Sequence, residues 1–325
     1  MSRSSGRLGG VPAAILLLCC VAWGLNQVAI KISLAGVSPL FGAGLRSLVA
    51  ALLLWLWCRL RGERLFVRDG TGGYGLLLGG MFAAEFILIY GGLAFTTASR
   101  SVIFLFSAPF FVALGAHLFI PGERLTASKV AGLVVAFVGL CLAFADGLYL
   151  PSRRELTGDV LELLGGLVWG GSTVVIKMRS DLSVTPQRTL FYQLTISTVL
   201  LIGAALALGE AGLTHPTPPV LSALAYQAVI VAFFSYLIWF WLLQRYPASG
   251  LASFSFWTPL FGVLAGWLLL GERLTGHLGA AAALVAVGIY LVNRRLTRAL
   301  TPPALTPLRR SGRSARAHLR RRCAR

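Results

Sequence analysis

Residues 105–126 read LFSAPFFVALGAHLFIPGERLT, and residues 255–275 read SFWTPLFGVLAGWLLLGERLT. Each stretch is an apolar segment that contains a proline, Pro109 in the first and Pro259 in the second, and each ends in the same Gly-Glu-Arg-Leu-Thr turn. The interval from the proline to the turn glycine is thirteen residues in the first stretch and twelve in the second. A signature that recurs 150 residues later in a chain of 325 residues predicts two homologous halves.

The composition is that of a chain that resides in lipid. Hydrophobic residues make up 57% of the chain, charged residues make up 12%, and the mean hydropathy is +0.79. A soluble domain carries about 25% charged residues, so this surface is not suited to water. The 37 glycines fit the same class, because transmembrane helices contain more glycine than soluble helices. We therefore expect an all-α, polytopic integral membrane protein.

The positive charge is concentrated at the C-terminal end. The formal net charge is +18, and residues 294–325 contain eleven arginines and no acid. A basic tail directly after a membrane helix is first of all a topology determinant on the cytoplasmic side, and it can also contact anionic lipid headgroups. The tail lacks the aromatic or groove-reading residues of a nucleic-acid site, so no nucleic-acid partner is predicted.

Apolar segments long enough to cross a bilayer follow one another along the chain. A spanning helix needs about 20 apolar residues, and ten such segments can be placed between short turns. They run approximately over residues 11–31, 39–58, 74–95, 101–120, 127–146, 158–178, 188–209, 221–244, 250–270 and 277–293. The expected organisation is a cytoplasmic N-terminus (1–10), a first repeat (11–146), an outer loop (147–157), a second repeat (158–293) and a basic tail (294–325), which we expect to be disordered.

The distribution of lysine and arginine predicts the orientation. With the N-terminus inside, the cytoplasmic side receives 12 of these residues before the tail, and the outer loops receive 5. This bias follows the positive-inside rule, so both termini are predicted to be cytoplasmic. We expect the chain to reside in the bacterial cytoplasmic (inner) membrane, and a homodimer is possible.

The two halves can be aligned over their whole length. Trp23-Gly24 precedes Lys31 by the same spacing with which Trp169-Gly170 precedes Lys177, and Ser38-Pro39 corresponds to Thr185-Pro186. Each half has five segments, and because five is an odd number, the second half enters the membrane from the opposite side. The fold prediction is therefore ten transmembrane helices arranged as two five-helix inverted-topology repeats. Such repeats recur in secondary transporters, which place the substrate at the interface of the repeats.

Several stretches together resemble the EamA family of the drug/metabolite transporter superfamily. They are VAWGLNQVAIKISLAGVSPLFGAGLRSLVAALLL at 21–54, the two Pro…Gly-Glu-Arg-Leu-Thr stretches, and TGDVLELLGGLVWGGSTVVIK at the start of the second half. The resemblance covers residues 11–293. It implies a ten-helix secondary carrier, in most cases an exporter of small metabolites such as amino acids, or of drugs.

Glu85 is the most pronounced single feature of the apolar segments. It lies about eleven residues into a helix of roughly 22 residues, hence near the middle of the bilayer at about 1.5 Å per residue. An ionised carboxylate there costs a few kcal/mol, and intramembrane acids usually mark ion or proton pathways. We interpret Glu85 as a proton carrier. The alternative is a hydrogen-bonded glutamate that only ties helices together.

Arg46 is the natural partner of Glu85. It is predicted to lie roughly 10 Å from the outer end of the second helix, close in depth to Glu85. The hypothesis is that Arg46 either pairs with Glu85 or meets a substrate carboxylate. The alternatives are that it extends to the outer surface by snorkelling, or that it is a structural arginine of the family.

The first helix of each half offers polar residues beside a tryptophan. Polar groups in hydrocarbon must find partners, and residues three apart share one face of a helix. They could form the wall of an amphipathic substrate pocket, or they could be polar contacts between helices. These residues are Trp23, Asn26 and Gln27 in the first half, and Trp169, Ser172 and Thr173 in the second.

The two prolines of the repeated stretch are predicted to lie within helices, where each removes a hydrogen bond and frees a carbonyl group. Pro109 and Pro259 could therefore form gating helices at the site, or simple packing kinks. Further candidates for lining a cavity are Tyr90, Tyr192, Gln193, Tyr236 and Trp257. The Gly-Glu-Arg-Leu-Thr turns themselves are interpreted as structural, with Thr126 and Thr275 as helix N-caps.

The leading prediction is a secondary active transporter that moves a small polar or amphipathic metabolite outward, coupled to protons. The sequence has no Walker A motif, so primary pumping by this chain is not predicted. The five cysteines and four histidines show no spacing of a metal site or disulfide framework, so neither a metal, a cofactor nor an enzyme is predicted. A lipid carrier or flippase of the same fold remains the main alternative, and an intramembrane enzyme a remote one.

Overall fold

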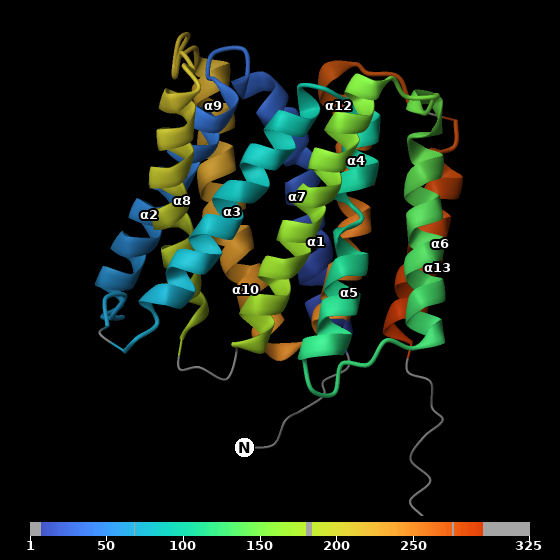
Figure 1. Cartoon of the computed structure of the whole chain (residues 1–325), viewed down its shortest axis with the longest axis horizontal. Helices are drawn as coiled ribbons and strands as arrows, with labels where there is room; N and C mark the ends of the chain where they lie inside the picture. The colour runs from blue at the N-terminus through green and yellow to red at the C-terminus, as the bar shows by residue number, and fades with distance from the viewer. Residues whose placement is uncertain (1–7, 68, 180–183, 275, 295–325) are drawn as a thin grey trace, which may run out of the picture. The chain divides into compact units, whose positions relative to one another are not determined.

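The structure is a computed structural model, which describes residues 8–67, 69–179, 184–274 and 276–294. These residues form helices, with one isolated β-bridge between Val37 and Leu213. The helices are α1 (Gly10–Ser33), α2 (Pro39–Leu60), α3 (Gly72–Leu93), α4 (Ala98–Leu105), α5 (Ala108–Phe119), α6 (Ala127–Ala143), the 3₁₀ turn η1 (Ala145–Gly147), α7 (Arg153–Met178), α8 (Pro186–Ala207), α9 (Pro218–Tyr226), the π-helix η2 (Gln227–Ser235), α10 (Tyr236–Arg245), α11 (Ala248–Ser253), the 3₁₀ turn η3 (Phe254–Phe256), α12 (Trp257–Leu270) and α13 (Leu278–Asn293) (Figure 1).

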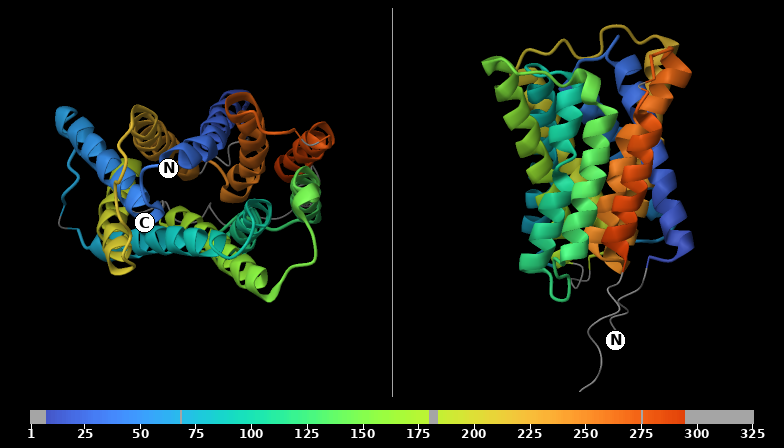
Figure 2. Two further views of the ribbon diagram at one scale, coloured as in Figure 1. Left: turned by 90° about the horizontal axis from the view of Figure 1, so that it is seen from above. Right: turned by 90° about the vertical axis from the view of Figure 1, so that its right-hand side faces the viewer.

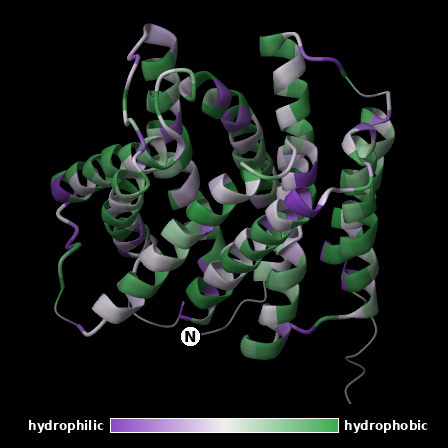
Figure 3. Cartoon of the chain, turned by 45° about the horizontal axis from the view of Figure 1, so that its top comes forward, coloured by the Kyte–Doolittle hydropathy of each residue, from purple (hydrophilic) through white to green (hydrophobic). Residues whose placement is uncertain are grey.

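The predicted all-α membrane fold is confirmed. Some elements follow one another as pieces of one span, namely α4 with α5, α9 with η2 and α10, and α11 with η3 and α12. Among the described residues, eight spans are long and apolar enough to cross a membrane, and α6 and α13 are shorter apolar helices of 17 and 16 residues. Hydrophobic residues dominate the helices (Figure 3). These ten segments correspond to the ten that the sequence predicts.

The helices begin where the sequence supplies suitable residues. Proline opens α2, α8 and α9, where its missing N–H is not needed. Thr126 accepts a hydrogen bond from the Lys129 backbone N–H, as predicted for an N-cap, and Thr185 caps α8 in the same way. The other predicted cap, Thr275, lies outside the described residues.

The fourth and ninth spans are broken rather than continuous. The fourth span breaks at Phe106–Ser107, and Pro109 is the second residue of α5. In the ninth span a 3₁₀ turn precedes α12, and Pro259 is the third residue of that helix. Each proline therefore lies in the first turn of a half-helix, where its ring causes no clash, and the helix is interrupted just before it.

The packing of the helices follows a pseudo-two-fold pattern. Helix α1 packs on α12 as α7 packs on α5, and α1 packs on the α9–η2 span as α7 packs on α3. Helices α2 and α8 pack on each other, and so do α6 and α13, which lie side by side at one edge of the bundle (Figures 1 and 2). These main contacts of one half thus have counterparts in the other, as inverted repeats require.

Helix α1 begins and α13 ends at the lower end of the bundle in Figure 1. We call this the terminus end, and the opposite end the far end. Lys31 in the last turn of α1 and the start of α4 belong to the far end.

Candidate functional site

A cavity of about 300 Å³ lies between the two halves. At the far end it is bordered by residues with exposed surface, namely Lys31, Leu34, Leu93 and Ala98. Towards the terminus end it stops at Ile176, Trp239 and Phe240, which are buried. The cavity is therefore open at the far end and closed at the terminus end.

Eleven of the fifteen residues predicted for the site line this cavity. They come from α1, α2, α3, α7, α8 and α10, and thus from both halves. They are Trp23, Asn26, Gln27, Arg46, Glu85, Tyr90, Trp169, Ser172, Thr173, Gln193 and Tyr236.

Arg46 lies in the first third of α2, and its residue is only 2% exposed. The guanidinium carbon lies 4.3 Å from the centroid of the Phe86 ring, and the group also interacts with the side chain of Tyr236. The Nε and Nη2 atoms have no hydrogen-bond partner among the described residues. A buried guanidinium with free donors requires an anion, because its desolvation costs several kcal/mol. Arg46 is therefore positioned to bind an anion.

Glu85 lies on α3 and is 9% exposed. Its carboxylate makes no hydrogen bond and no ion pair within 4 Å among the described residues, where the ion pairs are Lys31–Glu272, Arg100–Asp159 and Arg188–Asp69. Arg46 is close enough to act on it electrostatically. The direct Arg46–Glu85 pair, one of the two predicted alternatives, is not formed in this structure. Both groups face the cavity instead.

The charges of the cavity come from one half only. Gln193 follows Pro186 by seven residues, as Arg46 follows Pro39, and it occupies the equivalent place on α8. Ser235 precedes Pro259 by 24 residues, as Glu85 precedes Pro109. The first half therefore supplies a cation and an anion to the cavity, and at the equivalent places the second half has the amide of Gln193, which lines the cavity, and the hydroxyl of Ser235, which does not belong to its lining. A ligand in this cavity meets one charged and one neutral wall.

Tryptophans form the sides of the cavity. The Trp23 indole N–H donates a 2.8 Å hydrogen bond to Ser235 Oγ, and the Trp23 ring meets Trp239 edge to face at 5.7 Å. Trp169 packs in the same way on Phe106, at 5.5 Å. These rings present apolar faces to the cavity.

The polar neighbours of the tryptophans do not connect helices. The Ser172 and Thr173 hydroxyls both donate to the Trp169 carbonyl of their own helix. Asn26 Oδ1 and Gln193 Oε1 are buried without a hydrogen-bond partner among the described residues. Buried polar atoms are normally satisfied. These two therefore mark places where a ligand can bind.

Four predicted residues lie away from the cavity. The Tyr192 hydroxyl accepts a 2.9 Å hydrogen bond from Arg188 Nη2, close to Thr71 in the connection before α3. Trp257 stacks on Phe261, with ring centroids 5.6 Å apart. Pro109 and Pro259 are buried at the starts of α5 and α12. The prolines shape the half-helices rather than the cavity wall.

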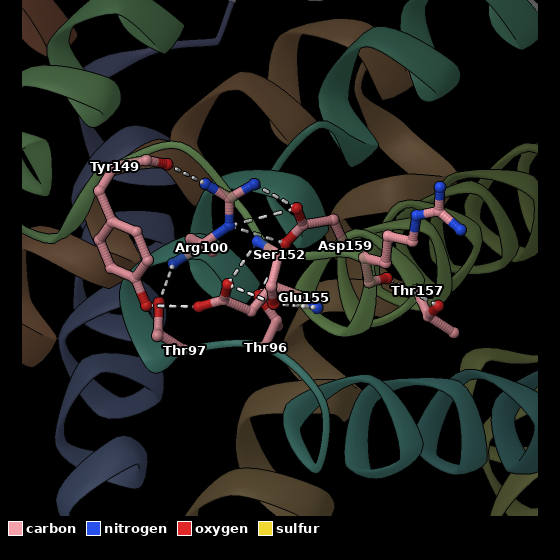
Figure 4. A network of polar contacts seen from close by, with 9 residues as sticks. Thr96, Thr97, Arg100, Tyr149, Ser152, Glu155, Thr157 and Asp159 are labelled. Atoms are coloured by element: carbon pink, nitrogen blue, oxygen red, sulfur yellow. Dashed lines mark hydrogen bonds and ion pairs between the residues drawn. The ribbon is translucent and has the colours of Figure 1, made fainter.

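A buried polar network between α4 and α7 was not predicted (Figure 4). Arg100 and Asp159 form an ion pair whose side chains are 7% and 3% exposed, and Thr96 Oγ1 donates to Asp159 Oδ1 at 2.7 Å. Arg100 is one of the five basic residues counted above for the outer loops, whereas it lies buried in α4. The signal for this network was the pair of acids Asp159 and Glu162, three residues apart on one face of the sixth span.

Glu162 extends this network towards the cavity. Its residue is fully buried, and its Oε1 atom accepts a 2.7 Å hydrogen bond from Ser101 Oγ, a residue of the cavity lining. At the surface of the network, the Tyr149 hydroxyl contacts the Glu155 carboxylate, and this hydrogen bond raises the pKa of Tyr149. The network therefore reaches the surface of the far end, and the separate Ser101–Glu162 hydrogen bond lies at the lining of the cavity.

Comparison with known proteins agrees with this architecture. The model of the EamA-like transporter family matches residues 11–145 and again residues 156–294. A probable amino-acid metabolite efflux pump of Escherichia coli (strain K12) is 31% identical over 300 residues, covering 90% of this chain and 95% of the relative. A riboflavin transporter of Rhizobium johnstonii is 27% identical over 218 residues, covering 65% of this chain and 67% of the relative. One crystal structure superposes with a TM-score of 0.76 at 18% identity, over 89% of this chain and 96% of the other, which shows the shared fold.

Proposed function

The chain belongs to the EamA-like transporter family, and from this premise we propose that it is a secondary active transporter that exports a small amino acid or a related amphipathic compound in exchange for protons. The observation that carries the proposal is Arg46, a buried guanidinium at the wall of a cavity that opens to one end of the bundle, with two donor nitrogens that have no hydrogen-bond partner among the described residues. The relatives named as probable amino-acid metabolite efflux pumps support the substrate class.

The two charges suit a zwitterion. A substrate carboxylate can accept hydrogen bonds from Arg46 Nε and Nη2, a geometry in which arginine binds carboxylates strongly. A substrate ammonium group can then pair with Glu85 on the same side of the cavity. The apolar part of the substrate lies between Trp23, Trp169 and the neutral wall around Gln193.

Competition for Glu85 provides the coupling. The Glu85 carboxylate binds either a proton or the substrate ammonium group, but not both. When the cavity opens outward, the substrate leaves and a proton takes its place, and when it opens inward, the exchange is reversed. The proton gradient then drives the substrate outward without any covalent step, as in alternating access between two repeats.

We propose that the terminus end faces the cytoplasm of a bacterial cell. The excess of lysine and arginine at this end supports that orientation, so the cavity of this structure is the outward-open state. Residues 11–146 and 158–293 are proposed as the two repeats. The proposed contact of the basic tail with anionic lipid headgroups, and its predicted disorder, concern residues 295–325, which lie outside the described residues. A homodimer remains a proposal from the sequence alone.

A second candidate function is the transport of a lipid or lipid-linked substrate. A hollow of about 800 Å³ lies at the side of the bundle, bordered by α1, η2 and α10, and its lining includes the exposed apolar residues Leu18, Phe234 and Trp241. Such a surface is suited to acyl chains. The two charged residues of the central cavity, Arg46 and Glu85, favour the first candidate, because an acyl chain has no charged group that could bind them.

The first experiment is a resistance screen. Cells of a sensitive bacterial host that express the chain are exposed to toxic amino-acid analogues, amines and dyes, and growth is compared with cells that express the Arg46→Ala variant. The proposal expects resistance to zwitterionic analogues, lost in the variant at equal amounts of protein in the membrane. Resistance to dyes or amines alone, or resistance that the variant retains, would contradict it. Transfer of a fluorescent phospholipid across proteoliposomes tests the second candidate.

A further inference from the structure

The two ends of the bundle hold equivalent residues in different arrangements. Lys31 and Lys177 each follow a Trp-Gly pair at the same spacing, and Glu123 and Glu272 are the glutamates of the two Gly-Glu-Arg-Leu-Thr turns. Because the repeats are inverted, the end of α7 with Lys177 and the α5–α6 connection with Glu123 lie at the closed terminus end. The end of α1 with Lys31 and the connection after α12 with Glu272 lie at the open far end (Figure 1). The structure therefore shows two equivalent lysine–glutamate pairs, one at a closed end of the cavity and one at an open end.

At the closed end, Glu123 holds the start of the ninth span. Its Oε1 accepts a 2.7 Å hydrogen bond from the Ala248 backbone N–H. Its Oε2 accepts hydrogen bonds of 3.2 and 3.1 Å from the Ser249 backbone N–H and Ser249 Oγ. The first N–H groups of a helix have no acceptor within the helix, so a carboxylate binds them well. Ala248 and Ser249 are buried as a result.

Lys177 binds the end of the preceding helix at the same place. Its Nζ donates to the carbonyl oxygens of Leu243 and Tyr246, at 2.8 and 2.9 Å, and it also interacts electrostatically with Glu123. The lysine and the glutamate together bind both sides of the turn between α10 and α11. This closes the cavity below Trp239 and Phe240.

At the open end, the equivalent lysine and glutamate side chains bind each other and, among the described residues, no further hydrogen-bond partner. Lys31 Nζ and Glu272 Oε1 form a 2.6 Å ion pair, and the two side chains are 54% and 43% exposed. The turn equivalent to Leu243–Ser249 is Leu93–Ser99, since Ala98 and Ala248 both lie eleven residues before their prolines. Leu93 and Ala98 border the mouth of the cavity together with Lys31, and both are exposed, whereas Leu243 and Ala248 are buried.

We propose that Lys31 and Glu272 form the outer gate of the transport cycle. When the far end closes, Glu272 accepts hydrogen bonds from the backbone N–H groups of Ala98 and Ser99 and from Ser99 Oγ. Lys31 then donates to the carbonyl groups of Leu93 and Thr96. Lys177 and Glu123 release their turn at the terminus end in the same step. This inference rests on the proposed function in one respect: it takes from it that the same cavity opens alternately at its two ends, and it names the residues that close each end.

A second pair of glutamates provides a matched control. Glu210 accepts hydrogen bonds of 3.1 and 2.9 Å from the backbone N–H groups of Leu40 and Phe41. Its equivalent, Glu63, lies beside Gln187 at the start of α8. Glu63 accepts a 3.5 Å hydrogen bond from the Gln187 side chain, and among the described residues neither glutamate has a hydrogen bond to the turns 93–99 and 243–249. Glu210→Gln weakens a contact between the halves without acting on the gate.

Thiol labelling of the full chain tests the gate. The five native cysteines are replaced, and either Leu93→Cys or Leu243→Cys is introduced. The labelling rate with a membrane-impermeant maleimide is then measured in lipid nanodiscs. Glu123→Gln should raise the labelling rate at position 243 by about tenfold, because losing a hydrogen bond to a charged group changes the equilibrium between the closed and open ends by about that factor. The labelling rate at position 93 should fall. Adding Glu272→Gln should reverse both changes, because the far end then lacks its own closing contact.

The expected result is this reciprocal pattern, with wild-type rates for Glu210→Gln. Ser249→Ala removes one hydrogen bond of Glu123 and the 2.9 Å hydrogen bond that Lys129 Nζ donates to Ser249 Oγ, while Glu123 keeps its two backbone hydrogen bonds. It should therefore shift the same rates in the same direction by less, which checks against misfolding of Glu123→Gln. Labelling at position 243 that rises while position 93 is unchanged, or a double variant that does not revert, would overturn the proposal. The experiment needs neither substrate nor proton gradient, so its outcome is independent of the proposed substrate and coupling.

Discussion

Arg46 and Glu85 are the residues to which we assign the binding and coupling steps of the proposed transport. The sequence shows both as charges within apolar spans, which was enough to predict that they matter. It could not show that they remain apart and face a common cavity, because that depends on how α2 and α3 pack. The ion pair of Arg100 and Asp159 could not be predicted from the sequence either. Neither residue is an isolated charge within an apolar segment, and their pairing depends on the contact of α4 with α7.

Substitution of Arg46 should abolish transport through loss of binding. Arg46→Ala removes the only group that the proposal assigns to the substrate carboxylate, so uptake into proteoliposomes of the compound selected by the screen should fall at least about 100-fold, as for a charged hydrogen-bonded partner. Arg46→Lys keeps the charge but not the two parallel donors, and should retain an intermediate rate. The hypothesis fails if both variants transport like the wild type.

Loss of Asp159 should destabilise the fold without involving the cavity. Asp159→Asn leaves the buried Arg100 guanidinium without its carboxylate, which costs about 3 kcal/mol. The midpoint of thermal unfolding of the purified protein, followed by tryptophan fluorescence, should fall by several degrees. The matched control is Asp146→Asn, at an exposed position in η1. Equal midpoints for the two variants would show that the Arg100–Asp159 pair does not contribute to stability.

At the scale of the elements, the sequence predicts where helices occur better than how they break. The ten segments follow from the length of apolar runs and the turn residues between them. Pro109 and Pro259 were predicted to lie within helices, as parts of gating helices or as packing kinks, since a proline in an apolar run does not reveal that it opens a half-helix. The π-helix η2 has no signal in its residues, QAVIVAFFS, because these would fit an α-helix equally well.

The contact of α6 with α13 depends on close approach of the two backbones. A Cβ atom on Gly288 would lie 2.5 Å from the Gly132 carbonyl oxygen and from the Ala136 nitrogen, both backbone atoms that cannot move aside. Gly288→Val should therefore lower the free energy of unfolding by about 1–3 kcal/mol, measured as the shift of the thermal midpoint. Gly279→Val, on the same helix with open space around it, is the control. Equal midpoints for both variants would contradict this packing.

At the scale of the whole molecule, the repeated Pro…Gly-Glu-Arg-Leu-Thr stretch revealed the duplication, and the odd number of spans in each half predicted its inversion. The structure adds that the halves are equivalent in fold but not in charge, since Arg46 and Glu85 correspond to Gln193 and Ser235. From a single sequence, a difference between the two repeats that serves function, such as Arg46 against Gln193, cannot be told apart from a difference without functional effect. The central claim is that the cavity between the halves exchanges a substrate for a proton held by Glu85.

Asp69 provides the control for that claim, because it is a carboxylate outside the spans. The hydrogen bond from Thr71, followed by that from Arg188, lowers its pKa to about 2. Its ionised form therefore contributes stability that is complete above the usual value of 3.8 and is lost only as the pH falls through about 2. Asp69 keeps its charge throughout the range in which transport is measured, so Asp69→Asn should leave the pH dependence of transport unchanged.

The most direct measurement is uptake of the screened substrate into proteoliposomes with and without an imposed pH gradient, for the wild type, Glu85→Gln and Asp69→Asn. The account predicts that uptake in the wild type and in Asp69→Asn is accelerated by the gradient that moves protons out of the vesicles. In Glu85→Gln, the gradient should have no effect, and proton movement should no longer accompany the substrate. A Glu85→Gln variant that is still driven by the pH gradient would contradict the account.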